Sequence, residues 1–190
     1  MAPQYTPKTT GKEIAENNKS AIAGKVVLIT GVTPGGLGAS FASTLASYSP
    51  SLIILAGRSV SASQTTASTI PSSVPTRILE LDLSSQTQVS SAAAEVNAYE
   101  ENIDVLVNNA GVMASPYAVT KDGLESQFGI NHIGHFLFTN LIISKVLKGN
   151  GGKGGRVVSV SSDGYRLSPV RFDDWGFDVS FLFYSCLWLW

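Results

Sequence analysis

The sequence predicts an α/β fold with a doubly wound parallel sheet, and two patterns carry this prediction. Short apolar runs rich in β-branched residues alternate along the chain with longer segments whose apolar residues recur at helical spacing. A glycine-rich turn, residues 31–38, joins the first apolar run to the first helical segment. Strands that alternate with helices in this way pair in parallel and carry helices on both faces of the sheet.

The first half of the chain predicts a short helix followed by a βαβ unit. Thr10 and Glu13 have the spacing of a capping box, which favours a helix over residues 10–21. The apolar run that follows is stopped by Gly31, as expected of a strand buried on both faces, and Pro50 ends the next helical segment. The unit is therefore expected at residues 26–30 (strand), 37–48 (helix) and 52–56 (strand).

The second half predicts three more strands and three more helices. Residues 59–68 are ambiguous alone, but the prolines after them favour a helix over residues 64–70. Further helices are expected at residues 86–102 and 122–148, and further strands at residues 77–81, 103–107 and 156–160. We expect the strand order 3-2-1-4-5, with the sheet truncated after the fifth strand. The glycine-rich residues 149–155 are expected to form a flexible connector.

Length, composition and charge limit the class of protein. The 190 residues, 44% of them hydrophobic, suffice for one domain with an ordinary core. The net charge of -1 comes from 13 basic and 14 acidic residues spread along the chain, so we expect no nucleic-acid partner and no membrane. The terminal apolar run is too short to span a bilayer. One cysteine, Cys186, and the lack of a signal-peptide pattern predict a cytoplasmic location.

The glycine-rich turn has the position of a dinucleotide-binding site. It lies between a strand and a helix, where a pyrophosphate would meet backbone N–H groups and the positive end of the helix. A Cβ atom there would hold the phosphates away, and the alternative is an ordinary strand-to-helix turn. The turn and the βαβ unit together favour a Rossmann-type site, whose candidate binding residues are Gly31, Gly35, Gly36, Leu37 and Gly38.

The end of the second strand predicts which cofactor is preferred. A carboxylate usually follows this strand and bonds the ribose 2′-OH of NAD. Here Asp and Glu are absent from residues 39–79, and Arg58 stands where an adenosine 2′-phosphate would lie. The alternative is a solvated surface arginine. The missing carboxylate and the arginine together favour NADP(H).

Five motifs in order resemble those of the short-chain dehydrogenase/reductase family. They cover about residues 24–171, and the sequence around the glycine turn and Asn131-His-Ile-Gly-His-Phe136 resembles the retinol-dehydrogenase-like branch. The turn has four residues between Gly31 and Gly36 where the family has three, which leaves open whether Gly35 or Gly36 lies nearer the pyrophosphate. The motifs are residues 30–38, Asp82-Leu83, Asn108-Asn109-Ala110-Gly111, Asn131 and Val160-Ser161-Ser162.

The resemblance implies roles for individual residues. Asp82 and Leu83 would border the adenine, and Asn109, Ala110 and Gly111 would line the cofactor cleft. Asn131 would support a proton-relay water, and Ser162 would hydrogen-bond the oxygen of a small alcohol or carbonyl substrate. Each has a structural alternative: a turn for residues 108–111, a helix-interior amide for Asn131 and a strand-end hydroxyl for Ser162. We expect no metal site, because no third ligand lies near His132 and His135 in sequence.

The family's catalytic tyrosine, with a lysine four residues later, has no counterpart after Ser162. Tyr165 is followed at that spacing by Pro169 and Tyr184 by Trp188, and no lysine occurs after Lys153. Tyr117 and Lys121 have the spacing, but they lie in an expected loop, so we interpret that match as accidental. The sequence therefore predicts a C-terminally truncated member of the lineage that is inactive as written.

The predicted organisation has three segments. Residues 1–23 form an N-terminal extension, residues 24–171 an NAD(P)-binding domain and residues 172–190 an atypical aromatic tail. The family pattern is lost after Trp175, which indicates a shifted reading frame or an untrimmed intron, or else a genuine short variant. The main functional hypothesis is hydride transfer between nicotinamide and an alcohol or carbonyl. The alternative is a non-catalytic nucleotide-binding or interaction protein, and the exposed fifth strand predicts self-association.

Overall fold

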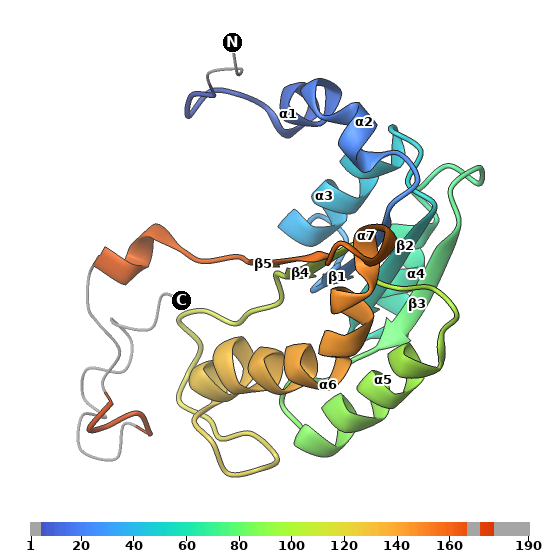
Figure 1. The fold of residues 1–190 in the computed structure, drawn as a ribbon. Helices are drawn as coiled ribbons and strands as arrows, with labels where there is room; N and C mark the ends of the chain where they lie inside the picture. The colour runs from blue at the N-terminus through green and yellow to red at the C-terminus, as the bar shows by residue number, and fades with distance from the viewer. Residues whose placement is uncertain (1–4, 167–171, 177–190) are drawn as a thin grey trace.

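Five parallel strands form one sheet in the order β3-β2-β1-β4-β5, which confirms the predicted fold class and strand order (Figure 1). The structure is a computed structural model and describes residues 5–166 and 172–176, so most of the aromatic tail lies outside the described residues. The strands are β1 (Val26–Thr30), β2 (Leu52–Gly57), β3 (Thr76–Glu80), β4 (Val105–Asn108) and β5 (Arg156–Ser159). Each differs from its predicted range by no more than two residues at either end.

The register of the sheet brings the C-terminal ends of the strands to one edge. Thr30 at the end of β1 is opposite Ala56 in β2, and Asn108 at the end of β4 is opposite Ser159 in β5. The strand order reverses between β1 and β4, which are direct neighbours. Ligands bind outside the carboxyl ends of the strands at such a reversal.

Successive side chains of the central strands point to opposite faces of the sheet, where helices cover them. Leu28 and Ile54 share one apolar cluster with Phe138 and lie under α5 (Gln86–Ala98) and α6 (His135–Leu147). Ile29 and Leu55 belong to the other cluster, which α3 (Leu37–Ala46) and α4 (Val60–Ala67) cover. Within the described residues, no helix is both long and apolar enough to cross a membrane.

The N-terminal segment forms two short helices, α1 (Gly11–Asn17) and α2 (Lys19–Ile22), in place of the single predicted helix. The predicted capping box is present. The Glu13 amide donates to Thr10 Oγ1 at 3.2 Å, and the Thr10 amide donates to Glu13 Oε2 at 2.7 Å. Residue 18 ends the first helix, because the backbone N–H of Asn18 bonds back to the Ala15 carbonyl.

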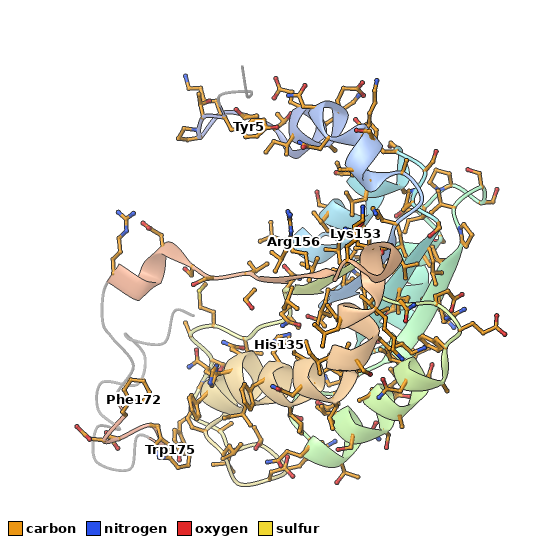
Figure 2. The ribbon with its side chains drawn as sticks, in the orientation of Figure 1. Tyr5, His135, Lys153, Arg156, Phe172 and Trp175 are labelled. Atoms are coloured by element: carbon orange, nitrogen blue, oxygen red, sulfur yellow. The ribbon has the colours of Figure 1, made fainter. Side chains whose placement is uncertain are left out.

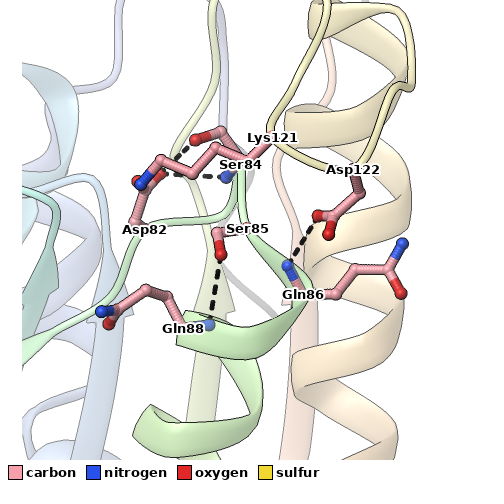
Figure 3. A network of polar contacts seen from close by, with 7 residues as sticks. All are labelled: Asp82, Ser84, Ser85, Gln86, Gln88, Lys121 and Asp122. Atoms are coloured by element: carbon pink, nitrogen blue, oxygen red, sulfur yellow. Dashed lines mark hydrogen bonds and ion pairs between the residues drawn. The ribbon is translucent and has the colours of Figure 1, made fainter.

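The predicted helix over residues 122–148 begins too early. The helical segment instead starts after Glu125, whose buried carboxylate accepts hydrogen bonds from the amides of Gln127 and Phe128, both at 2.7 Å. A π-helical turn, η1 (Phe128–Gly134), then leads into α6. Asp122 has a different task, since its Oδ2 accepts the Gln86 amide at 2.8 Å and caps α5 (Figure 3). The acidic residue thus caps a helix from a distant part of the chain.

The predicted helix over residues 64–70 is displaced. The helix α4 spans Val60–Ala67, because the hydroxyl of Ser59 accepts the Ala62 amide at 3.2 Å and caps it earlier. The cap falls within the stretch that was ambiguous in sequence.

The glycine-rich residues 149–155, which we expected to be flexible, are packed closely against the start of β4. They include α7 (Gly149–Gly152), a tight turn in which Asn150 and Gly151 have left-handed backbone conformations. The Gly155 amide donates to the Val146 carbonyl at 2.7 Å. A Cβ atom at Gly155 would lie 2.4 Å from the carbonyl oxygen of Ile103, so the chain can pass here only without a side chain.

Strand β5 lies at the edge of the sheet, as predicted. Within the described residues it pairs with β4 alone. Val157 and Val158 are 38% and 39% exposed, whereas Leu28 and Ile29 in β1 are fully buried. This edge therefore presents an apolar, half-open surface.

Replacing Gly155 by Ala should destabilise the fold, because the added methyl group collides with the Ile103 carbonyl in a connector that cannot shift without moving β4. We expect a loss of roughly 1 to 3 kcal/mol in the free energy of unfolding, measured by urea denaturation. Gly11→Ala is the matched control, since nothing lies within 4 Å of a Cβ there and the position is helical. Equal stability of the two variants would contradict the packing argument.

Candidate functional site

A cleft of about 370 Å³ opens at the C-terminal edge of the sheet, over the ends of β1, β2 and β4. It collects predicted binding residues from separate parts of the chain. These are Gly31, Leu37, Arg58, Asp82, Leu83, Asn109, Ala110 and Gly111. The predicted residues that do not line it are Gly35, Gly36 and Gly38, which act within the turn itself.

The glycine turn is required by a close approach between β1 and the loop after β4. Gly31 has a φ of +74°, and a Cβ atom on it would lie 2.6 Å from the Cα of Ala110. A Cβ atom on Gly38 would lie 2.5 Å from the Gly31 carbonyl oxygen. Gly35 has a left-handed φ of +80°, which favours glycine at this position. Gly36 is the N-cap of α3. The turn therefore presents bare backbone beside the first amides of α3, as a phosphate group requires.

Asp82 is fixed as a carboxylate at one end of this cleft (Figure 3). It accepts hydrogen bonds from the Ser84 hydroxyl at 2.6 Å and amide at 3.0 Å, and pairs with the Lys121 ammonium at 2.9 Å. Partial burial works to raise the pKa of Asp82, but these hydrogen bonds and the Lys121 charge outweigh it, and the net pKa is lowered.

Tyr117 and Lys121, which have the family's spacing, lie outside the helices of the described structure. Neither residue lies in a helix, so their spacing does not place them on one helical face. The ammonium of Lys121 is on Asp82, at the rim of the first cleft. The interpretation of the match as accidental stays a prediction.

Arg58 follows β2 and is exposed in the first cleft. Among the described residues that line this cleft, Asp82 is the one acidic side chain, and it follows β3 and not β2. The end of β2 therefore offers a guanidinium and the Ser59 hydroxyl to a ligand, with no carboxylate beside them.

A second cleft of about 680 Å³ adjoins the first and contains both predicted catalytic residues, Asn131 and Ser162. It is lined on its apolar side by the exposed side chains of Met113 and Phe136. The two clefts share a wall, which consists of Leu37, Asn109, Ala110 and Gly111. The first cleft therefore meets, at this wall, the cleft that contains Ser162 and Asn131.

Asn131 lies within the π-helical turn η1, and its side chain holds the loop after β4. Its Oδ1 accepts the Val112 amide at 2.9 Å, and its Nδ2 donates to the Val112 carbonyl at 2.8 Å. Gly111 passes directly over it, since a Cβ atom there would lie 3.3 Å from Asn131 Oδ1. The amide of Asn131 therefore positions the shared wall of the two clefts.

Two polar residues of the site were not assigned a role from the sequence, Thr30 and His135. The Thr30 hydroxyl accepts the amides of Asn109 and Ala110, both at 2.9 Å, and lies 2.9 Å from His135 Nε2. His135 is the first residue of α6, and its ring lies between the sheet and the helical segment (Figure 2). A threonine at a strand end is too common a feature for sequence alone to single it out.

Ser162 follows β5 and precedes a short 3-10 helix, η2 (Asp163–Arg166). Its hydroxyl accepts the Gly164 amide at 3.1 Å and retains its own proton for a further partner. Two imidazole side chains, those of His132 and His135, are among the residues that line the second cleft.

Comparisons with known proteins place these motifs in a family. The family model for short chain dehydrogenases matches residues 25–169. Oxidoreductase fscI of Fusarium equiseti is 36% identical over 171 residues, which cover 87% of this chain and 66% of the relative. Retinol dehydrogenase 13 of Homo sapiens is 37% identical over 160 residues, covering 83% of this chain and 47% of the relative.

A solved structure gives the same result for the fold. The crystal structure of an uncharacterised protein from Mycobacterium paratuberculosis matches with a TM-score of 0.70 at 35% identity, covering 83% of this chain and 53% of that one. The chain thus spans between about half and two thirds of the length of the proteins it matches. The match to the family model includes both clefts, from the glycine turn to Ser162. The chain therefore belongs to the short-chain dehydrogenase family, an oxidoreductase family, and within it resembles the retinol dehydrogenases.

Proposed function

We propose that the chain binds a nicotinamide dinucleotide along the first cleft, with the nicotinamide end entering the second cleft. The observation that carries this proposal is that the two clefts share a wall, and that this wall lies where the strand order reverses between β1 and β4. The fit is supported by the bare backbone at Gly31 and Gly38, which a Cβ atom would close. The pyrophosphate would lie over the turn 31–38, and the adenosine would lie toward Asp82 and Leu83.

We propose NADP(H) as the preferred cofactor. The support is the position of Arg58 in the cleft after β2, together with the lack of an acidic side chain from that strand. A guanidinium forms charge-assisted hydrogen bonds with a phosphate, whereas a carboxylate would repel it.

The second cleft would hold a small alcohol or carbonyl substrate. The bound nicotinamide supplies the hydride donor or acceptor in this family's chemistry. The Ser162 hydroxyl would donate a hydrogen bond to the substrate oxygen. Met113 and Phe136 would cover apolar parts of the substrate. Because both atoms of the Asn131 amide are held by Val112, we propose that Asn131 contributes to any water contact through the second lone pair of Oδ1 or the second N–H of Nδ2.

Proton transfer is the step for which these 190 residues offer no evident group. Ser162 is a poor proton acceptor near neutral pH, and the sequence after it contains no lysine. We therefore propose that this polypeptide binds cofactor without turnover. Measurements of cofactor binding and of turnover also test the alternative, a non-catalytic nucleotide-binding protein. The segment limits at residues 24 and 171 and the cytoplasmic location remain predictions.

Arg58→Ala should narrow the preference for NADPH over NADH, because the guanidinium contact with the 2′-phosphate is worth about 1.5 to 3 kcal/mol. Isothermal titration of both cofactors into both proteins measures the difference. Arg156→Ala is the matched control, since Arg156 is exposed and lines neither cleft. Equal affinity of the unmodified chain for the two cofactors would refute the NADP(H) assignment.

The 190-residue polypeptide should not oxidise NADPH measurably in the presence of ketones or aldehydes, even where it binds the cofactor. General acid-base catalysis alone contributes a factor of about 100 to 10,000. The assay follows the absorbance of NADPH with a panel of substrates. Substantial turnover that Tyr117→Phe abolishes would show that Tyr117 and Lys121 are a functional pair after all.

We also propose that the open edge of β5 mediates self-association. Val158 is 39% exposed and Val160 46% exposed along this edge, and exposed strand edges pair with other chains. Val158→Lys should shift the sedimentation coefficient toward that of a monomer, with the cofactor affinity unchanged. A wild-type chain that sediments as a monomer at all concentrations would exclude the proposal.

A further inference from the structure

We infer that His135 is a positioning residue, which in its neutral form orients the Thr30 hydroxyl and so holds the wall that the two clefts share. The inference rests on the proposed cofactor binding, because it concerns how the same site is kept in shape. It adds a condition to that function, namely that one buried imidazole must be uncharged.

The hydrogen bonds of His135 define its tautomer. Nδ1 lies 3.1 Å from the carbonyl oxygen of Asn131, and a carbonyl can only accept, so Nδ1 carries the proton. In the neutral ring Nε2 is then an acceptor, and it lies 2.9 Å from Thr30 Oγ1. The hydroxyl of Thr30 therefore donates to His135.

This donation leaves the lone pairs of the Thr30 oxygen for the loop after β4. A hydroxyl has two acceptor sites, and here the amides of Asn109 and Ala110 occupy both. The side chain of Asn109 also donates to the carbonyl oxygens of Thr30 and Gly31 at 2.9 and 3.0 Å. Through one hydroxyl, His135 thus connects η1 to β1 and to the shared wall.

A second proton on His135 would break this arrangement. Nε2 would become a donor, and the Thr30 oxygen would face three N–H groups with two acceptor sites. The hydroxyl proton would have to turn toward the Val107 carbonyl, which lies 3.4 Å away. One amide of the wall, or the imidazolium itself, would then be left without a partner in a buried position.

The surroundings of His135 favour the neutral form. His135 is 6% exposed, and its burial lowers the pKa of the imidazole below the ordinary value of 6.5. The hydrogen bond to the Asn131 carbonyl opposes this lowering, whereas the nearby His132 adds to it. No carboxylate lines the second cleft among the described residues, and the residues that β4, α3 and β5 contribute to it are uncharged. The charged groups of the first cleft are Arg58 and Asp82.

The direction of the pH effect follows from linkage. Because the binding-competent wall requires neutral His135, cofactor affinity is complete well above pH 6.5 and is lost as the pH falls through the lowered pKa. Each pH unit below that pKa would weaken binding by up to about tenfold. The 2′-phosphate of NADP+ also titrates, with a pKa near about 6, so the effect of His135 must be separated from it.

Two substitutions of His135 make this separation. The side-chain oxygen of Gln can accept a hydrogen bond from the Thr30 hydroxyl, but Gln does not titrate. Leu has a similar size and offers no hydrogen-bond acceptor. We expect His135→Gln to bind NADP+ at about pH 7.5 nearly as tightly as the wild type, and His135→Leu about tenfold or more weakly. Titrations down to about pH 4.5 should show a steeper loss for the wild type than for His135→Gln, which retains only the pH dependence of the phosphate.

Amide hydrogen exchange of the cofactor-free chain tests the same inference without any ligand. The amides of Asn109 and Ala110 should be protected in the wild type and His135→Gln near neutral pH, and exposed in His135→Leu. On acidification they should lose protection in the wild type before they do so in His135→Gln, while near-UV circular dichroism follows the global fold.

The two readouts distinguish the failures. Normal protection of these amides without NADP+ binding would refute the proposed function and leave the role of His135 intact. Parallel pH profiles for the wild type and His135→Gln, or wild-type affinity and protection in His135→Leu, would overturn the inference. If His135→Leu does not fold, the wild-type and His135→Gln profiles decide alone.

Discussion

The close approach of Gly31 to Ala110 is the constraint on which the site depends. A Cβ atom on Gly31 would lie only 2.6 Å from the Cα of Ala110, so no side chain fits there. The end of β1 and the loop after β4 therefore meet backbone to backbone. This contact is possible because β1 and β4 are direct neighbours in a parallel sheet and end at the same edge. Both clefts are arranged around it, one on each side of residues 109–111.

Backbone contact alone would leave the polar groups of this junction without partners, and buried unpaired amides are costly. The Thr30 hydroxyl and the Asn109 side chain satisfy them, using short hydrogen bonds between β1 and the loop after β4. The π-helical turn brings Asn131 and His135 to the other side of the same loop. A glycine contact and a polar network thus stabilise one wall from two directions.

Much of the fold was predictable because the strands are buried on both faces and read as continuous apolar runs, as in residues 26–30. The candidate site was predictable where a motif is local, such as the turn 31–38 and residues 108–111. The helix start at residue 126 was not, because Glu125 acts as a cap through burial that only the tertiary structure creates. The bond between Thr30 and His135 joins residues 105 positions apart, and no local pattern encodes it.

The shared wall also explains why the cofactor and substrate sites proposed for this chain cannot be treated separately. Leu37, Asn109, Ala110 and Gly111 face both clefts, so a displacement of residues 109–111 would change the two sites together. Catalysis by positioning tolerates little displacement, since misplacement of about 1 Å can cost a factor of about 100 in rate. The residues that fix the wall would therefore affect the geometry of both proposed sites as much as those that would touch a ligand. In this sense Asn131 and Thr30 belong to the candidate site even though, in this structure, their side-chain polar groups bond mainly to other parts of the protein.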